Sequence, residues 1–409
     1  MQAEESTLSI RMIYIIILLF FVLIPVYILP SGGFQLVDLT IILAMVHASL
    51  TIRTKEFEPG RLVVMLLALY VSWAILVNII HFLFKSELFF MKATAQLVLI
   101  AFMFGAFVVL FQKTILRRGG VLCIYIGLLL SLIPPFFVTG SYDVPTTEGV
   151  SGVSIRSALS FNNPNQLGYF ALLVLTILFL VRIYAERFEY TRLQARLMGF
   201  IGFVVFVMTH LFTVFSASRA ALISMAFLDV FICWKFRKQL IVCLLCLLFL
   251  VPPTLFAFSD KLPKFDILVF QRLLTTDVES AMSRRVGSRF FQSLGSEIAI
   301  VCGAGGVSNN PKVVEVHNAF ADMVLCYGII GLGLFLLFLS AVLLPYFLFI
   351  RRYDQLYYPL LMGPVLLYNV AHNGLRFRLF WIFVALWFAV TRRSMEMGME
   401  EGEAQNVPC

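Results

Sequence analysis

The chain has 409 residues, of which 61% are hydrophobic and only 13% are charged. No soluble fold could bury so much apolar surface, so we expect the lipid bilayer to surround most of the chain. The net charge of +8 would suit a nucleic-acid partner, but the distribution of the basic residues argues against that class.

Apolar segments long enough to span a bilayer follow one another along the chain. Backbone groups in lipid must be satisfied internally, and segments of this length fit helices rather than barrel strands. The first segment lacks a small-residue cleavage site, so we expect a retained helix rather than a signal peptide. The sequence predicts an all-α polytopic membrane protein with about 12 transmembrane helices, forming a single membrane domain over residues 1–409. The segments lie near residues 11–29, 34–51, 61–84, 93–111, 121–138, 166–183, 197–215, 220–235, 239–258, 327–350, 357–372 and 377–391.

The basic residues cluster in alternate connections between these segments. By the positive-inside rule this pattern places both termini in the cytoplasm, and it makes the charge a matter of topology with no nucleic-acid partner. The clusters are Arg53, Lys55 and Arg61; Lys113, Arg117 and Arg118; Arg182, Arg187, Arg192 and Arg196; Lys235, Arg237 and Lys238; Arg351 and Arg352; and Arg392 and Arg393.

Four segments remain on the outward side: the smaller loop 139–165, residues 216–219, the large loop 259–318, and residues 372–378. In the first, Asn163 followed by Pro164 predicts an N-cap and first helical residue. The positive end of that helix would face outward and suits an anion, with Arg156 a few residues upstream. Capping alone is the alternative, but it explains neither Asn165 nor Arg156.

The second segment, "FSASRAALIS", places Arg219 in the first turn of a helix that Ser216 or Ser218 can cap. A cation there opposes the helix dipole, at a cost of roughly 0.3–1 kcal/mol, unless an anion offsets it. A snorkelling arginine is the alternative interpretation.

The large loop, 259–318, is the only one long enough to form a small folded lid. If 283–294 is helical, Arg285 and Arg289 share a face, whereas Arg284 points elsewhere. A solvated surface helix is the alternative. The "GAGG" at 303–306 lacks the strand–turn–helix setting of a dinucleotide loop.

His317 is the only histidine of the large loop, and it stands with Asn318 at the mouth of the tenth apolar segment. His372 is a second outward candidate, with Arg376 nearby. Histidine is well suited to move a proton near neutral pH, although a structural role is the alternative. The outward segments hold no H-x-x-H motif or dense carboxylate cluster, so we expect no metal and no cofactor. Arginines gathered at the outer boundary suggest a lipid-linked phosphate or pyrophosphate.

Several motifs together resemble those of the O-antigen ligase/polymerase family of bacterial envelopes. They are Arg156 with "NNPNQLG", "SASRAAL", an arginine-containing loop closing on "GAGG", and His317 followed by ten residues and Gly328. The resemblance runs from about Arg156 to Gly331, and the later segment "HNGLRFRLFWIF" resembles the family more weakly. The first five predicted helices match the family only in hydropathy.

The resemblance implies metal-independent glycosyl transfer at the periplasmic face of the bacterial inner membrane, from a glycan on undecaprenyl pyrophosphate to an acceptor sugar hydroxyl. Arg156, Arg219 and Arg285 would stabilise the departing pyrophosphate, with Arg284 or Arg289 as substitutes for Arg285. His317 would orient or deprotonate the hydroxyl. The remaining substrate-binding candidates are Asn163, Asn165, Asn318, His372 and Arg376. Gly328 and Gly331 would let the helix after His317 pack closely on its neighbours.

Two activities fit this resemblance. We favour a polymerase of O-antigen or exopolysaccharide repeat units, because the "NPN", "SR" and "HN" set is widespread in that group. A ligase that transfers the glycan to the lipid A core is the alternative, and the His–ten–Gly spacing favours it. The implied partners are the lipid-linked donor, a lipid-linked repeat or lipid A core as acceptor, the bilayer and a chain-length regulator. A lipid-linked glycan transporter is a further alternative, although transporters usually place ionisable residues near the middle of the membrane.

Overall fold

A computed structural model describes residues 7–27, 35–51, 60–115, 117–137, 159–161, 163–237, 297–306, 318–349 and 357–405. Within these ranges most residues are helical and none is in a strand, so the all-α prediction is confirmed. Six of the helices in the described residues are long and apolar enough to cross a membrane. The chain is therefore an all-α membrane-embedded protein.

Each predicted apolar segment overlaps a helix, except 239–258, which lies outside the described residues. The last helix continues to Gln405, beyond its predicted end at 391, and the short helix Glu297–Cys302 was not predicted. Helix α16 begins eight residues earlier than the tenth predicted segment, because Asn318 caps it ahead of the polar Asp322. The helices are α1 Thr7–Leu23, α2 Leu36–Thr51, α4 Arg61–Lys85, α5 Leu88–Ile115, α6 Arg118–Ser131, α7 Pro134–Phe137, α8 Pro164–Ala185, α9 Arg192–Ser216, α10 Arg219–Lys235, α15 Glu297–Cys302, α16 Ala319–Phe349, α17 Tyr357–Ala371 and α18 Arg378–Gln405.

The bundle has two ends that differ in the charged residues they carry. We call one the network end: α2, α8, α10, α16 and α18 begin there, and ion pairs link the first turns of α2, α16 and α18 to neighbouring segments. We call the other the basic end: α4, α6, α9 and α17 begin there. Its described cations include Arg61, Arg117, Arg118, Arg192, Arg196, Lys235, Arg237, Arg392 and Arg393.

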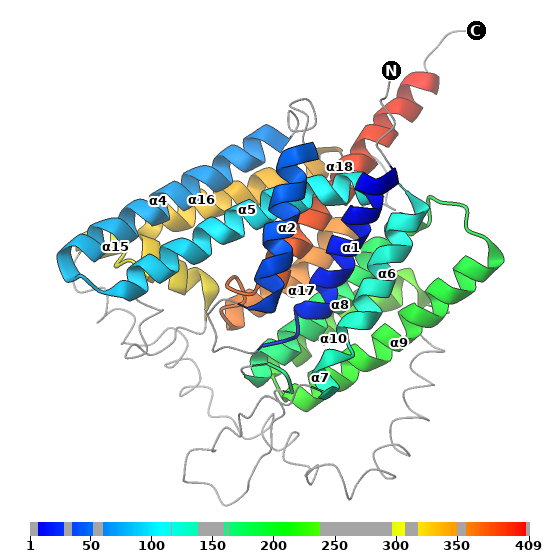
Figure 1. Ribbon diagram of the computed structural model, residues 1–409, viewed down its shortest axis with the longest axis horizontal. Helices are drawn as coiled ribbons and strands as arrows, with labels where there is room; N and C mark the ends of the chain where they lie inside the picture. The colour runs from blue at the N-terminus through cyan, green and yellow to red at the C-terminus, as the bar shows by residue number, and fades with distance from the viewer. Residues whose placement is uncertain are drawn as a thin grey trace, which may run out of the picture.

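Helix α8 forms the centre of the bundle. It packs against α6, α9, α10, α17 and α18 (Figure 1). Of the residues in its most apolar 18-residue stretch, 94% are buried inside the protein. A helix that is apolar on every side suits either lipid or a protein interior, and here neighbouring helices enclose it. Its N-cap Asn163 and its first-turn residue Asn165, both candidate site residues, are therefore held in a fixed position by the surrounding helices.

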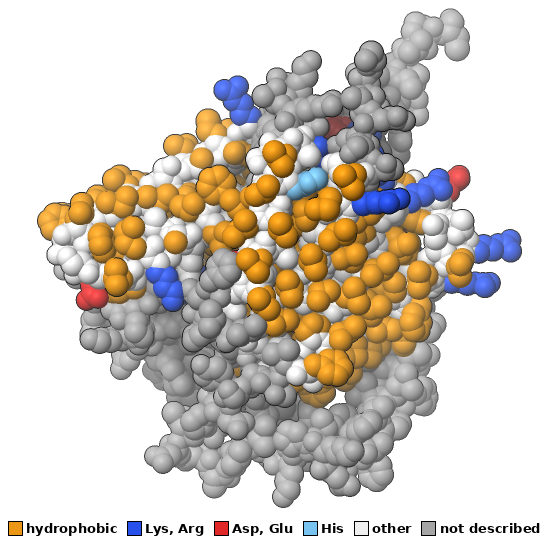
Figure 2. Space-filling view, viewed as in Figure 1, with side chains coloured by type: hydrophobic (Ala, Val, Ile, Leu, Met, Phe, Trp, Pro, Cys, Tyr) orange, Lys and Arg blue, Asp and Glu red, His pale blue; other side chains and the backbone are white. Residues whose placement is uncertain are grey.

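The surface is apolar over a broad area. Figure 2 shows hydrophobic side chains across most of one face, with most Lys and Arg side chains at its margin. Large exposed side chains such as Phe102, Phe200, Val230 and Leu337 lie on several different helices. A soluble monomer rarely exposes so extensive a patch, whereas a lipid-facing surface does.

Helix α16 is broken at Gly328, where the backbone has φ 70° and ψ −176°. The break leaves carbonyl groups without their usual helical partners, and the "GAGG" segment supplies new ones. The backbone amide of Ala304 donates to the Leu325 carbonyl at 2.9 Å, and that of Gly305 donates to the Cys326 carbonyl at 2.8 Å. The Trp73 indole donates to Tyr327 at 2.8 Å. The glycine-rich segment is thus a packing element against α16.

At Gly328 the expected close packing on a neighbouring segment is present, because a Cβ there would collide with the backbone of Val301 and Cys302. At Gly331 the atom nearest to an added Cβ is Tyr327 Cβ of the same helix, and the neighbouring Trp73 ring lies 3.4 Å away.

Candidate functional site

The candidate residues that the structure describes all lie at the network end. They are Asn163 and Asn165 on α8, Arg219 on α10, Asn318 and the start of α16, and His372 and Arg376 in the turn between α17 and α18. The other candidates, Arg156, Arg284, Arg285, Arg289 and His317, lie outside the described residues.

The first turns of α8 and α10 meet at this end. The Asn163 side chain accepts a hydrogen bond from the Gln166 amide at 2.9 Å, and Pro164 is the first helical residue, as the sequence predicted. Gly168 allows the contact with α10, because a Cβ there would lie 2.7 Å from both Ser216 Oγ and Ala221 Cβ. Arg219 is the first residue of α10, and the start of α10 packs against the amino end of α8.

An aromatic stack joins α17 to the start of α8. The Tyr368 hydroxyl donates to the Asn165 carbonyl at 2.8 Å, and its ring stacks on Tyr169 with centroids 4.1 Å apart. His372 stacks on the Tyr368 ring at 5.5 Å. Gly374 makes room for the stack, because a Cβ there would lie 2.5 Å from the Tyr169 ring. His372 is therefore positioned by ring packing one turn beyond Tyr368.

Asp322 organises the turn between α17 and α18, a role that its local sequence does not indicate. Its carboxylate accepts from Asn373 Nδ2 at 2.7 Å and from Arg376 Nη2 at 3.1 Å. The Asp322 residue is 7% exposed, whereas the Arg376 side chain is 36% exposed. The Asp322 carboxylate thus balances the charge of Arg376 within the protein. Arg376 is therefore a weaker candidate for binding an anion.

Asn318 is the N-cap of α16. Its side-chain oxygen accepts from the amides of Phe320 and Ala321, each at 3.0 Å. The cap occupies the carbonyl oxygen, so the amide nitrogen is the part of this side chain left to contact a substrate.

A second ion pair, also missed from sequence, links α2 to α18. Arg378 Nε lies 2.6 Å from Asp38 Oδ1, and its Nη2 donates to Oδ2 at 2.7 Å. The same Oδ2 accepts from the Gln35 amide at 2.7 Å. Asp38 is fully buried, and the two-point contact fixes the first turn of α18 against that of α2. The only sequence signal was an aspartate and an arginine in the first turns of two apolar segments.

The network end therefore combines converging helix amino ends with two arginines that carboxylates balance and a third, Arg219, at a helix start. Such an end favours an anion near the surface of the bundle. In the described part of the chain, no group of three or more His, Cys, Asp or Glu residues is placed to hold a metal ion. The chain matches no protein-family model, and a search of curated proteins finds no match.

Proposed function

We propose that this protein transfers a glycan from undecaprenyl pyrophosphate to an acceptor sugar hydroxyl at the network end. In this proposal the chain spans the bacterial inner membrane about 12 times, with both termini in the cytoplasm and the network end at the periplasmic face. The concentration of described cations at the opposite end supports this orientation through the positive-inside rule.

The observation that carries the proposal is the position of Arg219. It occupies the first turn of α10, against the capped amino end of α8. Guanidinium groups and helix-start amides both bind phosphate, so a pyrophosphate bound here would accept from Arg219 and from the amides at these helix starts. The resemblance in sequence motifs independently names Arg219 among the groups that stabilise the leaving pyrophosphate.

The proposed reaction is a displacement at the anomeric carbon of the donor glycan. The acceptor hydroxyl oxygen forms a bond to that carbon as the bond to the pyrophosphate oxygen breaks. His317 takes the proton of the hydroxyl, and arginines including Arg219 stabilise the charge that develops on the pyrophosphate. Asn318, next to His317, would contact the sugar through its amide nitrogen.

We favour a lipid-linked repeat unit as the acceptor, which makes the protein a polymerase. The His–ten–Gly spacing supports the second candidate, a ligase that uses the lipid A core. The two differ only in the acceptor, so they share the donor and the leaving-group chemistry.

The test is chain growth by the purified full-length protein in liposomes supplied with lipid-linked repeat units alone. Polymerisation without a core acceptor supports the polymerase, and transfer only after core oligosaccharide is added supports the ligase. Arg219→Ala is expected to reduce the rate roughly 10²–10³-fold, the usual effect of losing one transition-state donor. Arg192→Ala, an exposed arginine at the basic end, is the matched control and should leave the rate unchanged.

A parallel assay in the same liposomes separates transfer from transport. The lipid-linked donor is followed across the bilayer for both variants and the wild type. Movement of donor across the bilayer without any glycan transfer by the wild-type protein would refute the proposal in favour of a transporter.

A further inference from the structure

The part of α16 before its break, residues 319–327, positions two groups of the candidate site. Asn318 caps its start, and Asp322 in its first turn binds the turn between α17 and α18. The break at Gly328 ends this first part of α16 after nine residues. The last carbonyls of a helix have no partner within the helix, so the end of this part needs hydrogen-bond donors from elsewhere in the protein.

Donors outside the helix satisfy three consecutive carbonyls at that end. The Leu325 and Cys326 carbonyls accept from backbone amides of the glycine-rich segment, residues 303–306. The Tyr327 carbonyl accepts from the Trp73 indole on α4 at 2.8 Å. The position of the first part of α16 therefore depends on the glycine-rich segment and on α4.

Two more side chains of α4 hold the glycine-rich segment itself. The Asn78 side-chain oxygen accepts from the Gly306 amide at 2.7 Å, and Asn78 is fully buried. His81 Nε2 donates to the Gly303 carbonyl at 3.2 Å. The His81 ring also stacks on Phe90 of α5, with centroids 5.5 Å apart. Helix α4 thus contacts both ends of the segment that satisfies the carbonyls of α16.

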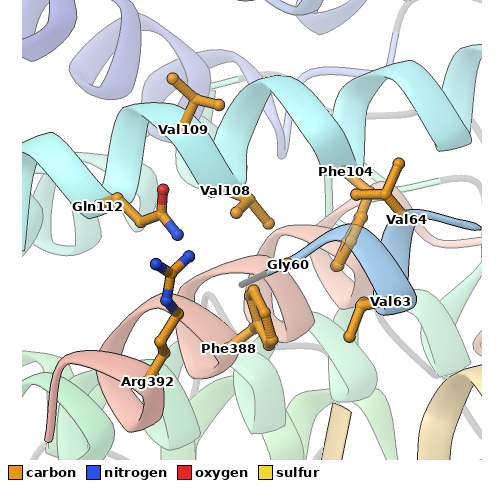
Figure 3. Close-up of a pocket in the computed structure, with 9 residues that line it drawn as sticks. All are labelled: Gly60, Val63, Val64, Phe104, Val108, Val109, Gln112, Phe388 and Arg392. Atoms are coloured by element: carbon orange, nitrogen blue, oxygen red, sulfur yellow. The ribbon is translucent and has the colours of Figure 1, made fainter. Parts of the chain in front are cut away.

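Helix α4 is held in turn by its neighbours. It packs against α5 and α16. Near its start, Val63 lies with Phe104 and Val108 of α5 and Phe388 of α18 around a small space between the three helices (Figure 3). Apolar side chains thus fix the start of α4, whereas its polar contacts lie between its middle and its end. The helix can therefore act as a rigid support for the glycine-rich segment.

We propose that Trp73, Asn78 and His81, which we call the α4 anchor, are positioning residues for glycan transfer. They do not touch the substrate; they set where the first part of α16 places Asn318 and the residue before it. This inference rests on the proposed function. Arg219, which binds the donor pyrophosphate in that proposal, belongs to α10, and α10 packs against α8, α9 and α17. Loss of the anchor should therefore lower kcat and leave the KM for the lipid-linked donor unchanged.

The first test compares two tryptophan-to-phenylalanine variants of the purified full-length protein in the liposome transfer assay. Trp73→Phe removes the indole donor to the Tyr327 carbonyl. Trp387→Phe is the matched control, because it removes an indole donor to the Tyr358 carbonyl at 2.9 Å, a bond that joins α18 to the basic-end start of α17. We expect Trp73→Phe to lower kcat roughly tenfold or more, since a small displacement of a reacting group is enough for such a loss. Trp387→Phe should keep the wild-type kcat. An equal fall in both variants overturns the proposal, because general destabilisation would then explain it.

Asn78 offers a second test that includes a rescue. Asn78→Leu leaves the buried Gly306 amide without its acceptor, whereas Asn78→Asp keeps an oxygen at that position. We expect Asn78→Leu to lose kcat to an extent similar to Trp73→Phe, and Asn78→Asp to recover most of the wild-type rate. Absence of recovery overturns the proposal. If Asn78→Leu does not fold, the comparison of Trp73→Phe with its control decides.

Hydrogen exchange of the backbone amides in residues 319–327, measured by mass spectrometry on the same proteins, reports on the anchor without using activity. It should be faster than in the wild type in Trp73→Phe and Asn78→Leu, and unchanged in Trp387→Phe. Unchanged exchange in all three variants overturns the proposal, and so does faster exchange with an unchanged kcat, while the proposed function then stands. Absence of transfer by the wild-type protein refutes the proposed function and with it the role of the anchor in transfer, and the exchange result still decides whether α4 holds α16.

Discussion

The buried pair of Asp38 and Arg378 offers a sharp test of how the network end is held together. Asp38→Asn removes one charge while keeping the size of the side chain and an oxygen able to accept from Gln35. Asp38 is fully buried and the Arg378 side chain is 14% exposed, so the guanidinium loses its counter-charge where little water can replace it. Removing one partner of a buried pair costs about 3–5 kcal/mol, and we expect a loss of that size.

The comparison pair is Asp322 and Arg376 at the same end. The Arg376 side chain is 36% exposed, so solvent can screen its charge once the partner is gone. We expect Asp322→Asn to cost about 1–2 kcal/mol, mostly through its hydrogen bonds. The double variant Asp38→Leu with Arg378→Met removes both buried charges and should be less destabilised than Asp38→Asn alone.

Unfolding of the purified protein in mixed micelles, followed by tryptophan fluorescence, gives these free energies. The single variants Asp38→Leu and Arg378→Met, measured in the same way, complete the cycle that gives the coupling between the two residues. The reasoning fails if Asp38→Asn stays within about 1 kcal/mol of the wild type. It also fails if Asp322→Asn is the more damaging of the two single variants.

Three further predictions use the same unfolding measurement. Gly328→Ala should lower the free energy of unfolding by at least about 3 kcal/mol, because the φ and ψ there suit only glycine and a Cβ would collide with Val301. Gly333→Ala should raise it by about 0.5–1 kcal/mol, because the space around Gly333 is open. Equal effects at the two positions would contradict the proposed break in α16. Asn163→Ala should cost about 1 kcal/mol through loss of the cap, and Asn163→Asp should restore it; a failure of that rescue would count against capping. Trp73→Phe should cost about 1 kcal/mol, because the hydrogen bond from the indole to the Tyr327 carbonyl is lost. An unchanged free energy of unfolding would show that water replaces this hydrogen bond.

Part of the candidate site was predictable because its signals are local. Asn163 and Pro164 predict a helix start, and the structure has that cap. Arg219 lies in the first turn of α10 as predicted, but the Ser218 side chain at the cap position makes no cap hydrogen bond. The start of α16 at Asn318 was not predicted from hydropathy, because the cap begins the helix eight residues before the apolar segment. The sequence did not reveal that carboxylates balance Arg376 and Arg378, because their partners lie 54 and 340 positions away.

The sequence by itself determined that the chain is a helical membrane protein and where most of its helices lie. The length of an apolar segment, its caps and the charges between segments are local features. They can be recognised in the sequence without knowing which helices pack together. Only the tertiary structure decided which first turns meet, that α8 is enclosed, and that "GAGG" satisfies the carbonyls freed at Gly328. The physical reason is that lipid gives helices no hydropathic preference for one neighbour over another, so close packing, hydrogen bonds and ion pairs between distant segments select the arrangement.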